Sequence, residues 1–430
     1  MAGDTDALTQ RIFDAVDANW ERQLEFTRDL IRYPSLRGRE HTAQEFVHAE
    51  LAKRGYAMDR WAIDVDAISD HPGFSPVAVS YENAVNVVGT HTPRQATGRS
   101  LILNGHIDVV PEGPHDMWTR PPFEPAVEGD WLYGRGGADM KAGIGANVFA
   151  MDALRSCGLQ PAATVYLQSV TEEECTGNGA LSALVRGYRA DAAIIPEPED
   201  DMVVRANCGV LWFAVEIKGR PVHVREATTG SSAILAAWTV IGALQQLERQ
   251  WNARKGDHRH FEDMDHPINI NIGKIQGGDW ASSVPAWCRL DVRAAIYPGV
   301  EPKDAAAEIE AAIRQAAAGD PFLSNNPPSV VFNGFFAKGY VLEEGTEVEA
   351  ILARSFERAY EGRQLQSFTT PGYLDGRVFV LYDDCPCLVF GPRSENIHGF
   401  DERVSLESVK RVTKTIAAFI ADWCGVEPVG

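Results

Sequence analysis

The chain has 430 residues, of which 45% are hydrophobic, and its formal net charge is −20 at pH 7. This length exceeds what one hydrophobic core usually supports, so we expect two domains or one domain with a large insertion. The negative charge argues against nucleic acid and anionic membranes as partners, because surfaces that bind phosphate groups normally carry clustered lysine and arginine.

The sequence also indicates a compartment. No stretch approaches the roughly 18 apolar residues of a membrane span, and the acidic segment 1–18 lacks the basic start and apolar run of a signal peptide. The seven cysteines are scattered singly or as Cys385-Pro386-Cys387, without CxxC spacing. We therefore predict a cytoplasmic protein with reduced, mostly buried thiols and no disulfide framework.

The first half of the chain alternates helical and strand patterns. Apolar residues recur at helical spacing from Leu8 to Leu24, which predicts an amphipathic helix. Short apolar runs at 100–103, 164–167 and 192–195 then alternate with helical patterns at 142–154 and 179–188. This alternation is typical of βαβ units and predicts a mostly parallel sheet covered by helices on both faces.

The pattern changes near Asn207. Strand patterns at 210–217, 268–272 and 288–292 combine with helical patterns at 231–251 and 301–318, which predicts an α+β unit with antiparallel strands. The α/β pattern returns after 325–328, with a helix at 347–360 and a strand at 387–390. The fold class is therefore predicted to be α/β, with a domain made of residues 1–206 and 334–430 interrupted by an inserted α+β domain at 207–333.

Acidic and histidine side chains follow several of the predicted strands. His106 follows the strand near residue 103, Glu173 and Glu174 follow the next one, and Glu197 follows the strand that ends near 195. In an open α/β sheet, the residues just past the carboxyl ends of the strands line the ligand crevice. We therefore expect these side chains to converge, and imidazole with several carboxylates is a donor set for metal ions.

Each segment has a structural explanation when it is considered alone. Asp139 opens a helix after a glycine-rich turn, which is typical of an N-cap. The acidic triplet 172–174 is typical of a solvated turn, and His398 of an ordinary loop. The glycine-rich run reads GxGxxD, which argues against nucleotide binding, and the absence of HExxH and GxSxG excludes single-zinc helical proteases and serine esterases. The expected convergence of these segments favours a metal hydrolase.

Several motifs stand in the order found in a known family. They are Gly105-His-Ile-Asp-Val-Val-Pro111, Leu132-Tyr-Gly-Arg-Gly-Gly-Ala-Asp-Met-Lys141, Glu173-Glu174, Glu197-Pro198 and Gly391-Pro392 before His398. The chain resembles the zinc amidohydrolases that include acetylornithine deacetylase, succinyl-diaminopimelate desuccinylase, aminoacylase and glutamate carboxypeptidase. The resemblance runs from about Asn86 to Glu407.

The resemblance implies two zinc ions in each subunit, which Co²⁺ is able to replace. Asp139 is implied to bridge the two ions, His106 and Glu197 to complete one site, and Glu174 and His398 to complete the other. Two zinc ions with three ligand carboxylates leave a net positive centre, which lowers the pKa of water.

The resemblance also implies the roles of three further residues. Glu173 is implied to be the general base. Asp108, two residues from His106 on an extended segment, is expected to accept the second ring N–H of that histidine. The inserted domain resembles a lid and dimerisation domain, and its His223 is implied to reach the partner subunit's site and polarise the scissile carbonyl.

Three residues are expected on the substrate side. Arg293 is implied to hold the substrate carboxylate, and Gly372 to line the same pocket. Ser282 stands where relatives have an asparagine that often contacts substrate, and Val224-Arg225 replaces the usual serine after the lid histidine. These departures bear on specificity and leave the reaction type unchanged.

We therefore predict a homodimeric enzyme that hydrolyses the amide bond of an N-acyl amino acid, as acetylornithine deacetylase and succinyl-diaminopimelate desuccinylase do. The alternative within hydrolases is a dipeptidase or carboxypeptidase with the same two-zinc centre, so the small-molecule partner is an N-acyl amino acid or a dipeptide. A metal-dependent binding or scaffold protein without catalysis is disfavoured, because the base and all five ligands are present together.

Overall fold

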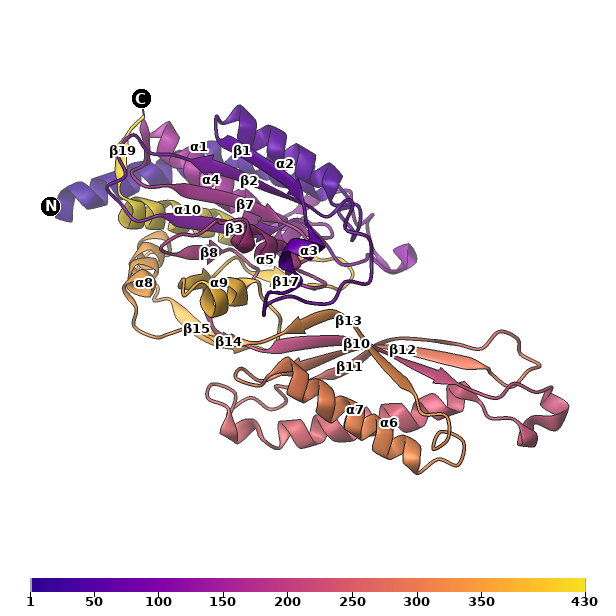
Figure 1. Cartoon of the computed structure of the whole chain (residues 1–430). Helices are drawn as coiled ribbons and strands as arrows, with labels where there is room; N and C mark the ends of the chain where they lie inside the picture. Colours follow the sequence, from indigo (N-terminus) through magenta and orange to yellow (C-terminus); the bar gives the residue numbers. More distant parts are fainter. Residues whose placement is uncertain (1, 430) are drawn as a thin grey trace.

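A six-stranded sheet forms the centre of the larger part of the molecule (Figure 1). The computed structural model describes residues 2–429. The strands have the order β1-β2-β7-β3-β8-β16, and the pairs β7–β3, β3–β8 and β8–β16 are parallel, whereas β1 and β2 form an antiparallel edge. Their bounds are β1 Ala57–Ala62, β2 Val85–His91, β3 Leu101–His106, β7 Val165–Val170, β8 Ala193–Ile195 and β16 Cys387–Val389. The predicted mostly parallel sheet is confirmed.

Two groups of helices flank this sheet. One group is α1, α2, α4, α8 and α10, which pack on one another, and the other is α3, α5 and α9. Their bounds are α1 Ala2–Ile31, α2 His41–Lys53, α3 Val65–Ile68, α4 Ala142–Ser156, α5 Asn178–Val185, α8 Glu347–Ala359, α9 Gly376–Tyr382 and α10 Leu406–Cys424. The helices predicted at 8–24, 142–154, 179–188 and 347–360 are confirmed as parts of α1, α4, α5 and α8.

A second, four-stranded sheet lies apart from the first and carries its own helices (Figure 1). Its order is β11-β12-β10-β13, and every pair is antiparallel, as predicted. The bounds are β10 Gly209–Lys218, β11 Ile270–Gly277, β12 Trp287–Ile296, β13 Ser329–Ala337, α6 Ala233–Asn252 and α7 Pro302–Ala318. These elements enclose a hydrophobic cluster separate from the cluster under the large sheet.

The strand β13 was not predicted. It pairs with β10 and continues to Ala337, so residue 333, where the insertion was predicted to end, lies within a hydrogen-bonded strand. The division of the chain into domains at 206/207 and 333/334 stays a prediction.

Three smaller sheets complete the fold. They are β14-β9-β15, β17-β18-β5-β4 and β19-β6. Their bounds are β4 Ala126–Glu128, β5 Trp131–Tyr133, β6 Leu159–Pro161, β9 Met202–Asn207, β14 Tyr340–Val341, β15 Gln366–Thr370, β17 Ser394–Glu395, β18 Arg403–Ser405 and β19 Val426–Pro428. The pairing of β5 with β18 matters for the site, because it brings the segment after residue 133 beside the segment before residue 403.

The cysteines agree with the prediction. All seven, which lie within residues 2–429, are free thiols, and five of them are buried. Among the described residues, no helix is both long and apolar enough to cross a bilayer.

Candidate metal centre

The carboxyl ends of three neighbouring parallel strands meet at one place. His106 is the last residue of β3, the pair Glu173 and Glu174 follows β7 after a short turn, and Glu197 follows β8. Because parallel strands end at the same edge of a sheet, these side chains come together, as the sequence predicted. Asp139 and His398 reach the same place from the loops before α4 and before β18.

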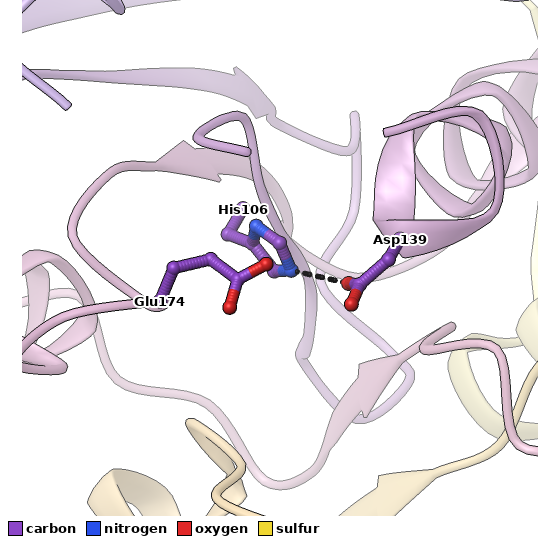
Figure 2. A group of neighbouring side chains, drawn as sticks. All are labelled: His106, Asp139 and Glu174. Atoms are coloured by element: carbon purple, nitrogen blue, oxygen red, sulfur yellow. Dashed lines mark hydrogen bonds and ion pairs between the residues drawn. The ribbon is translucent and has the colours of Figure 1, made fainter. Parts of the chain in front are cut away.

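Asp139 lies between two histidines. Its Oδ1 is 2.9 Å from His106 Nε2, and its Oδ2 is 3.3 Å from His398 Nε2. His398 Nε2 also lies 3.1 Å from Glu174 Oε1. Figure 2 shows the imidazole of His106 and the carboxylates of Asp139 and Glu174 pointing toward one another, and donor atoms of these three residues lie within 4.8 Å of each other. One carboxylate therefore lies between two imidazoles, with the Glu174 carboxylate close to both.

The remaining two carboxylates lie near His106. His106 Nε2 lies 3.6 Å from Glu197 Oε1 and 3.9 Å from Glu173 Oε2. His106, Glu173 and Glu197 are all at least nine-tenths buried. The six residues predicted as ligands or base are thus brought together.

The acidic triplet is not a solvated turn. Glu172 is 1% exposed, and its carboxylate accepts a bidentate pair of hydrogen bonds from Arg37 at 2.6 and 2.8 Å. Tyr81 donates a further hydrogen bond to it at 2.6 Å. This bonding leaves Glu173 and Glu174 to face the centre, so the three adjacent carboxylates have separate partners.

Asp108 contacts His106 differently from the expectation. His106 Nδ1 lies 2.9 Å from the backbone carbonyl oxygen of Asp108 and 3.6 Å from its carboxylate. The Asp108 carboxylate instead accepts a hydrogen bond from the backbone N–H of Glu174 at 3.1 Å. The expected carboxylate–imidazole hydrogen bond is therefore replaced by a carbonyl contact, and the Asp108 carboxylate holds the backbone of a second candidate ligand.

Burial and neighbouring charges shift the pKa values of the side chains at the centre. Burial raises the pKa of Glu173 well above its usual range, and the neighbouring carboxylate of Glu197 acts in the same direction. Burial likewise raises the pKa of Glu197 to about 7. The pKa of His398 rises to about 11, chiefly because the carboxylate of Glu174 lies beside its ring. Positive charge placed among these carboxylates would favour their ionised forms.

The donor set fits divalent cations. Glu197 Oε1 is buried and has no hydrogen-bond partner within residues 2–429. A buried, unpaired carboxylate oxygen is costly, and a cation between the carboxylates and the imidazoles would remove that cost. Nitrogen and carboxylate oxygen donors in this combination suit zinc and related ions.

Sequence reasoning missed an ion pair that joins the two ligand loops. Arg135 Nη1 donates to Glu402 Oε2 at 2.5 Å, and both side chains are almost completely buried. Glu402 Oε1 accepts hydrogen bonds from the backbone N–H groups of Ala138 and Asp139 at 3.0 and 3.2 Å, while Arg135 Nη2 donates to the carbonyl oxygen of Gly399 at 3.0 Å. One feature of the sequence could have indicated this pair. Arg135 lies inside a glycine-rich run, whereas an arginine exposed to solvent does not need glycine neighbours.

We expect Glu402→Gln to destabilise the protein by about 3–5 kcal/mol, because it leaves the Arg135 guanidinium buried without its counter-charge. Chemical denaturation, monitored by circular dichroism, measures this change. The matched control is Glu395→Gln, which removes a more exposed ion pair with Arg403 and should cost no more than about 1 kcal/mol. Equal losses of stability in the two variants would contradict a stabilising role for the buried Arg135–Glu402 pair.

A cavity of about 560 Å³ opens onto the centre. Its lining includes Asp139, both members of the Glu173–Glu174 pair, Arg293 on β12 and Gly372 after β15. Arg293 is half-buried, and its guanidinium donates to the carbonyl oxygen of Pro371 at 3.0 Å. Arg293 and Gly372, which the sequence predicted on the substrate side, therefore line the same cavity as the candidate metal ligands.

Two other predicted residues lie elsewhere. His223 and Ser282 are exposed on the second sheet's loops, where His223 pairs with the neighbouring Ser283, and neither lines the cavity. The His223 ring is bound by the nearby backbone, since the N–H of Arg225 donates to His223 Nδ1 at 3.1 Å. Within one chain, the structure does not bring these two residues to the centre.

Comparisons with known proteins place these observations in context. A model of the Peptidase family M20/M25/M40 matches residues 102–422. An N-formyl-4-amino-5-aminomethyl-2-methylpyrimidine deformylase of Halalkalibacterium halodurans is 28% identical over 445 residues, covering 97% of this chain and 98% of the relative. A succinyl-diaminopimelate desuccinylase of Methylocella silvestris is 26% identical and covers 92% and 96%. The solved structure of human carnosine dipeptidase 1 has the same fold, with a TM-score of 0.76 at 13% identity, covering 97% of this chain and 99% of that one.

Proposed function

The chain belongs to the Peptidase family M20/M25/M40, and on that premise we propose that it is a metal-dependent deacylase acting on the amide bond of a small N-acyl compound. Relatives named as a deformylase and a desuccinylase, each matched over more than nine-tenths of both chains, support removal of an acyl group from an amine. The structural neighbour shares the fold and carries no argument on the choice between deacylase and peptidase.

The observation that carries the proposal is the position of Asp139. Its two carboxylate oxygens face His106 and His398, one on each side. We infer that His106 and Glu197 hold one zinc ion, that Glu174 and His398 hold the other, and that Asp139 binds both. When bound, these ions would supply Lewis acidity that lowers the pKa of water and polarises a carbonyl oxygen. Cobalt is expected to replace zinc in the same donor set.

Glu173 is proposed to move the proton. It lines the cavity beside the candidate ligands, where its carboxylate is able to take a proton from water and return it to the leaving nitrogen. Asp108 orients the pair of candidate ligands His106 and Glu174 through the contacts described above. Arg293 is proposed to bind an anionic or acceptor group of the substrate.

A substrate panel separates the proposed deacylase from a dipeptidase or carboxypeptidase. Formyl, acetyl and succinyl amides are compared with dipeptides on the zinc-loaded enzyme, and kcat/KM is measured for each. The deacylase proposal requires that an acyl amide be the best substrate. A higher kcat/KM for dipeptides would establish the alternative.

We also propose that the enzyme is a homodimer formed through the second sheet. Leu235 and Trp238 on α6 are 69% and 64% exposed, and Ile275 on the edge strand β11 is 51% exposed. Large apolar side chains beside an unpaired strand edge favour association with another chain. The free thiols support a location in the reducing cytoplasm.

Complementation between two inactive variants tests whether His223 acts in the partner's site. Glu173→Gln and His223→Ala homodimers are each expected to be inactive, because every site lacks one group. In a mixed dimer, one site combines Glu173 of one chain with His223 of the other, so random mixing should restore about a quarter of the wild-type activity. No recovery after subunit exchange would show that His223 does not act across the interface.

A further inference from the structure

Three aromatic side chains form a wall in the cavity beside the candidate metal centre. Trp212 of β10, Phe335 of β13 and Tyr373 after β15 all line it. The rings of Trp212 and Phe335 meet edge to face with centroids 5.2 Å apart, and those of Phe335 and Tyr373 lie 4.3 Å apart. Together with Val210 and Ala337 they form a hydrophobic cluster separate from both main cores. No step of the proposed reaction uses these rings.

The backbone makes room for two of these rings. A Cβ atom placed on Gly334 would lie 2.7 Å from the Trp212 ring, and one placed on Gly177 would lie 1.8 Å from the Tyr373 hydroxyl. The Tyr373 hydroxyl is also fixed, because it donates to Asp375 Oδ1 and accepts from Arg377 Nε, each at 2.9 Å. The wall is therefore held in place by its surroundings before any ligand binds.

The side chains of Arg293 and Asn271 lie in register with Trp212 on the next two strands of the sheet and provide hydrogen-bond donors beside the wall. Trp212 pairs with Arg293 across β10 and β12, and Arg293 pairs with Asn271 across β12 and β11. Directly opposed residues in antiparallel strands project from the same face of the sheet, and all three line the cavity. Arg293 has no carboxylate partner within residues 2–429, so its guanidinium and the Asn271 amide are available to an acceptor on a ligand.

The aromatic wall and the neighbouring donors of Arg293 and Asn271 together favour an amine that carries a flat ring. A flat heteroaromatic ring can pack against the wall, face to face with one ring and edge to face with another, while its ring nitrogens accept hydrogen bonds from the nearby donors. An aliphatic ammonium chain could also lie over an aromatic face, but the Arg377 guanidinium is already 5.3 Å from the centre of the Tyr373 ring, and Arg293 flanks Trp212. A second cation there would be repelled by both.

We propose that the leaving amine of the substrate carries a planar heteroaromatic ring, as an aminomethylpyrimidine does, and that this ring packs against the wall formed by Trp212, Phe335 and Tyr373. The inference rests on the proposed deacylase function and adds the class of amine that is released.

Two amides with the same acyl group test this on the zinc-loaded enzyme. The N-formyl amide of an aminomethylpyrimidine should have a kcat/KM at least about 10-fold higher than that of N-formylornithine. Trp212→Leu should lower kcat/KM for the pyrimidine amide at least about 10-fold more than for the ornithine amide, while Trp212→Phe, which keeps an aromatic face, should retain most of the preference. The matched control is Trp61→Leu, which removes a half-buried tryptophan on the far edge strand β1 and should leave the preference unchanged.

Equal or better hydrolysis of N-formylornithine, or an equal loss for both amides in Trp212→Leu, would overturn the inference while the deacylase proposal stands. Hydrolysis of neither amide would count against the proposed function. Calorimetric binding of the free amines then decides the inference separately. Tighter binding of the aminomethylpyrimidine than of ornithine, weakened by Trp212→Leu in protein with unchanged thermal unfolding, supports it, and equal affinities overturn it.

Discussion

Glu173→Gln is expected to lower kcat about a thousandfold while both metal ions remain bound. Glutamine has the size and shape of glutamate, but its amide cannot accept and return a proton, and proton transfer by a positioned side chain contributes about 10²–10⁴ in rate. Glu173 is buried against the candidate ligands and lines the cavity, so bulk water cannot easily replace it. The measurement is kcat on a formyl or acetyl amide, with metal content determined on the same sample.

The matched control for this variant is Glu199→Gln. Glu199 lines the same cavity and has no assigned part in proton transfer, so this variant should retain most of the activity. A Glu173→Gln enzyme with near wild-type kcat, or an equal loss in both variants, would show that the proton is moved by another group.

Asp139→Asn is expected to weaken the binding of both metal ions together and to remove activity. The substitution takes away one negative charge and one of the two oxygens that face His106 and His398. Loss of an outer partner alone costs about 10–100-fold in metal affinity, and loss of a shared ligand should cost more for each ion. Competition with a zinc chelator measures both affinities.

The control for the aspartate variant is Asp116→Asn, which changes an exposed aspartate outside the centre and should leave both affinities as they are. If Asp139→Asn weakened only one ion and left the other at its wild-type affinity, the carboxylate would not be shared between two sites.

The sequence predicted the elements whose periodicity is strong. The alternation of short apolar runs with helical patterns was sufficient for the parallel strands β3, β7 and β8, and four of the six residues at the centre lie at or just past the ends of these strands. The helix α10 has apolar residues at helical spacing from Val409 to Ile420 and was open to the same argument, but it was not predicted. Strand β13 was missed because apolar and polar residues do not alternate along Ser329–Ala337.

The supporting contacts of the site could not be predicted because they join distant parts of the chain. Arg135 and Glu402 are 267 residues apart in sequence, and only the pairing of β5 with β18 brings their segments together. The aromatic wall likewise needs β10, β13 and the loop after β15 to be placed in space. Local sequence showed which residue types were present, while tertiary pairing determined which of them meet.

The central claim is that two metal ions share the carboxylate of Asp139. Crystals of the zinc-loaded protein, with diffraction recorded on both sides of the zinc absorption edge, test it directly. The account predicts two anomalous peaks about 3.5–4 Å apart, one on each side of that carboxylate, with His106 and Glu197 at one peak and Glu174 and His398 at the other. A single peak, or peaks away from Asp139 in protein that hydrolyses its substrate, would contradict the account.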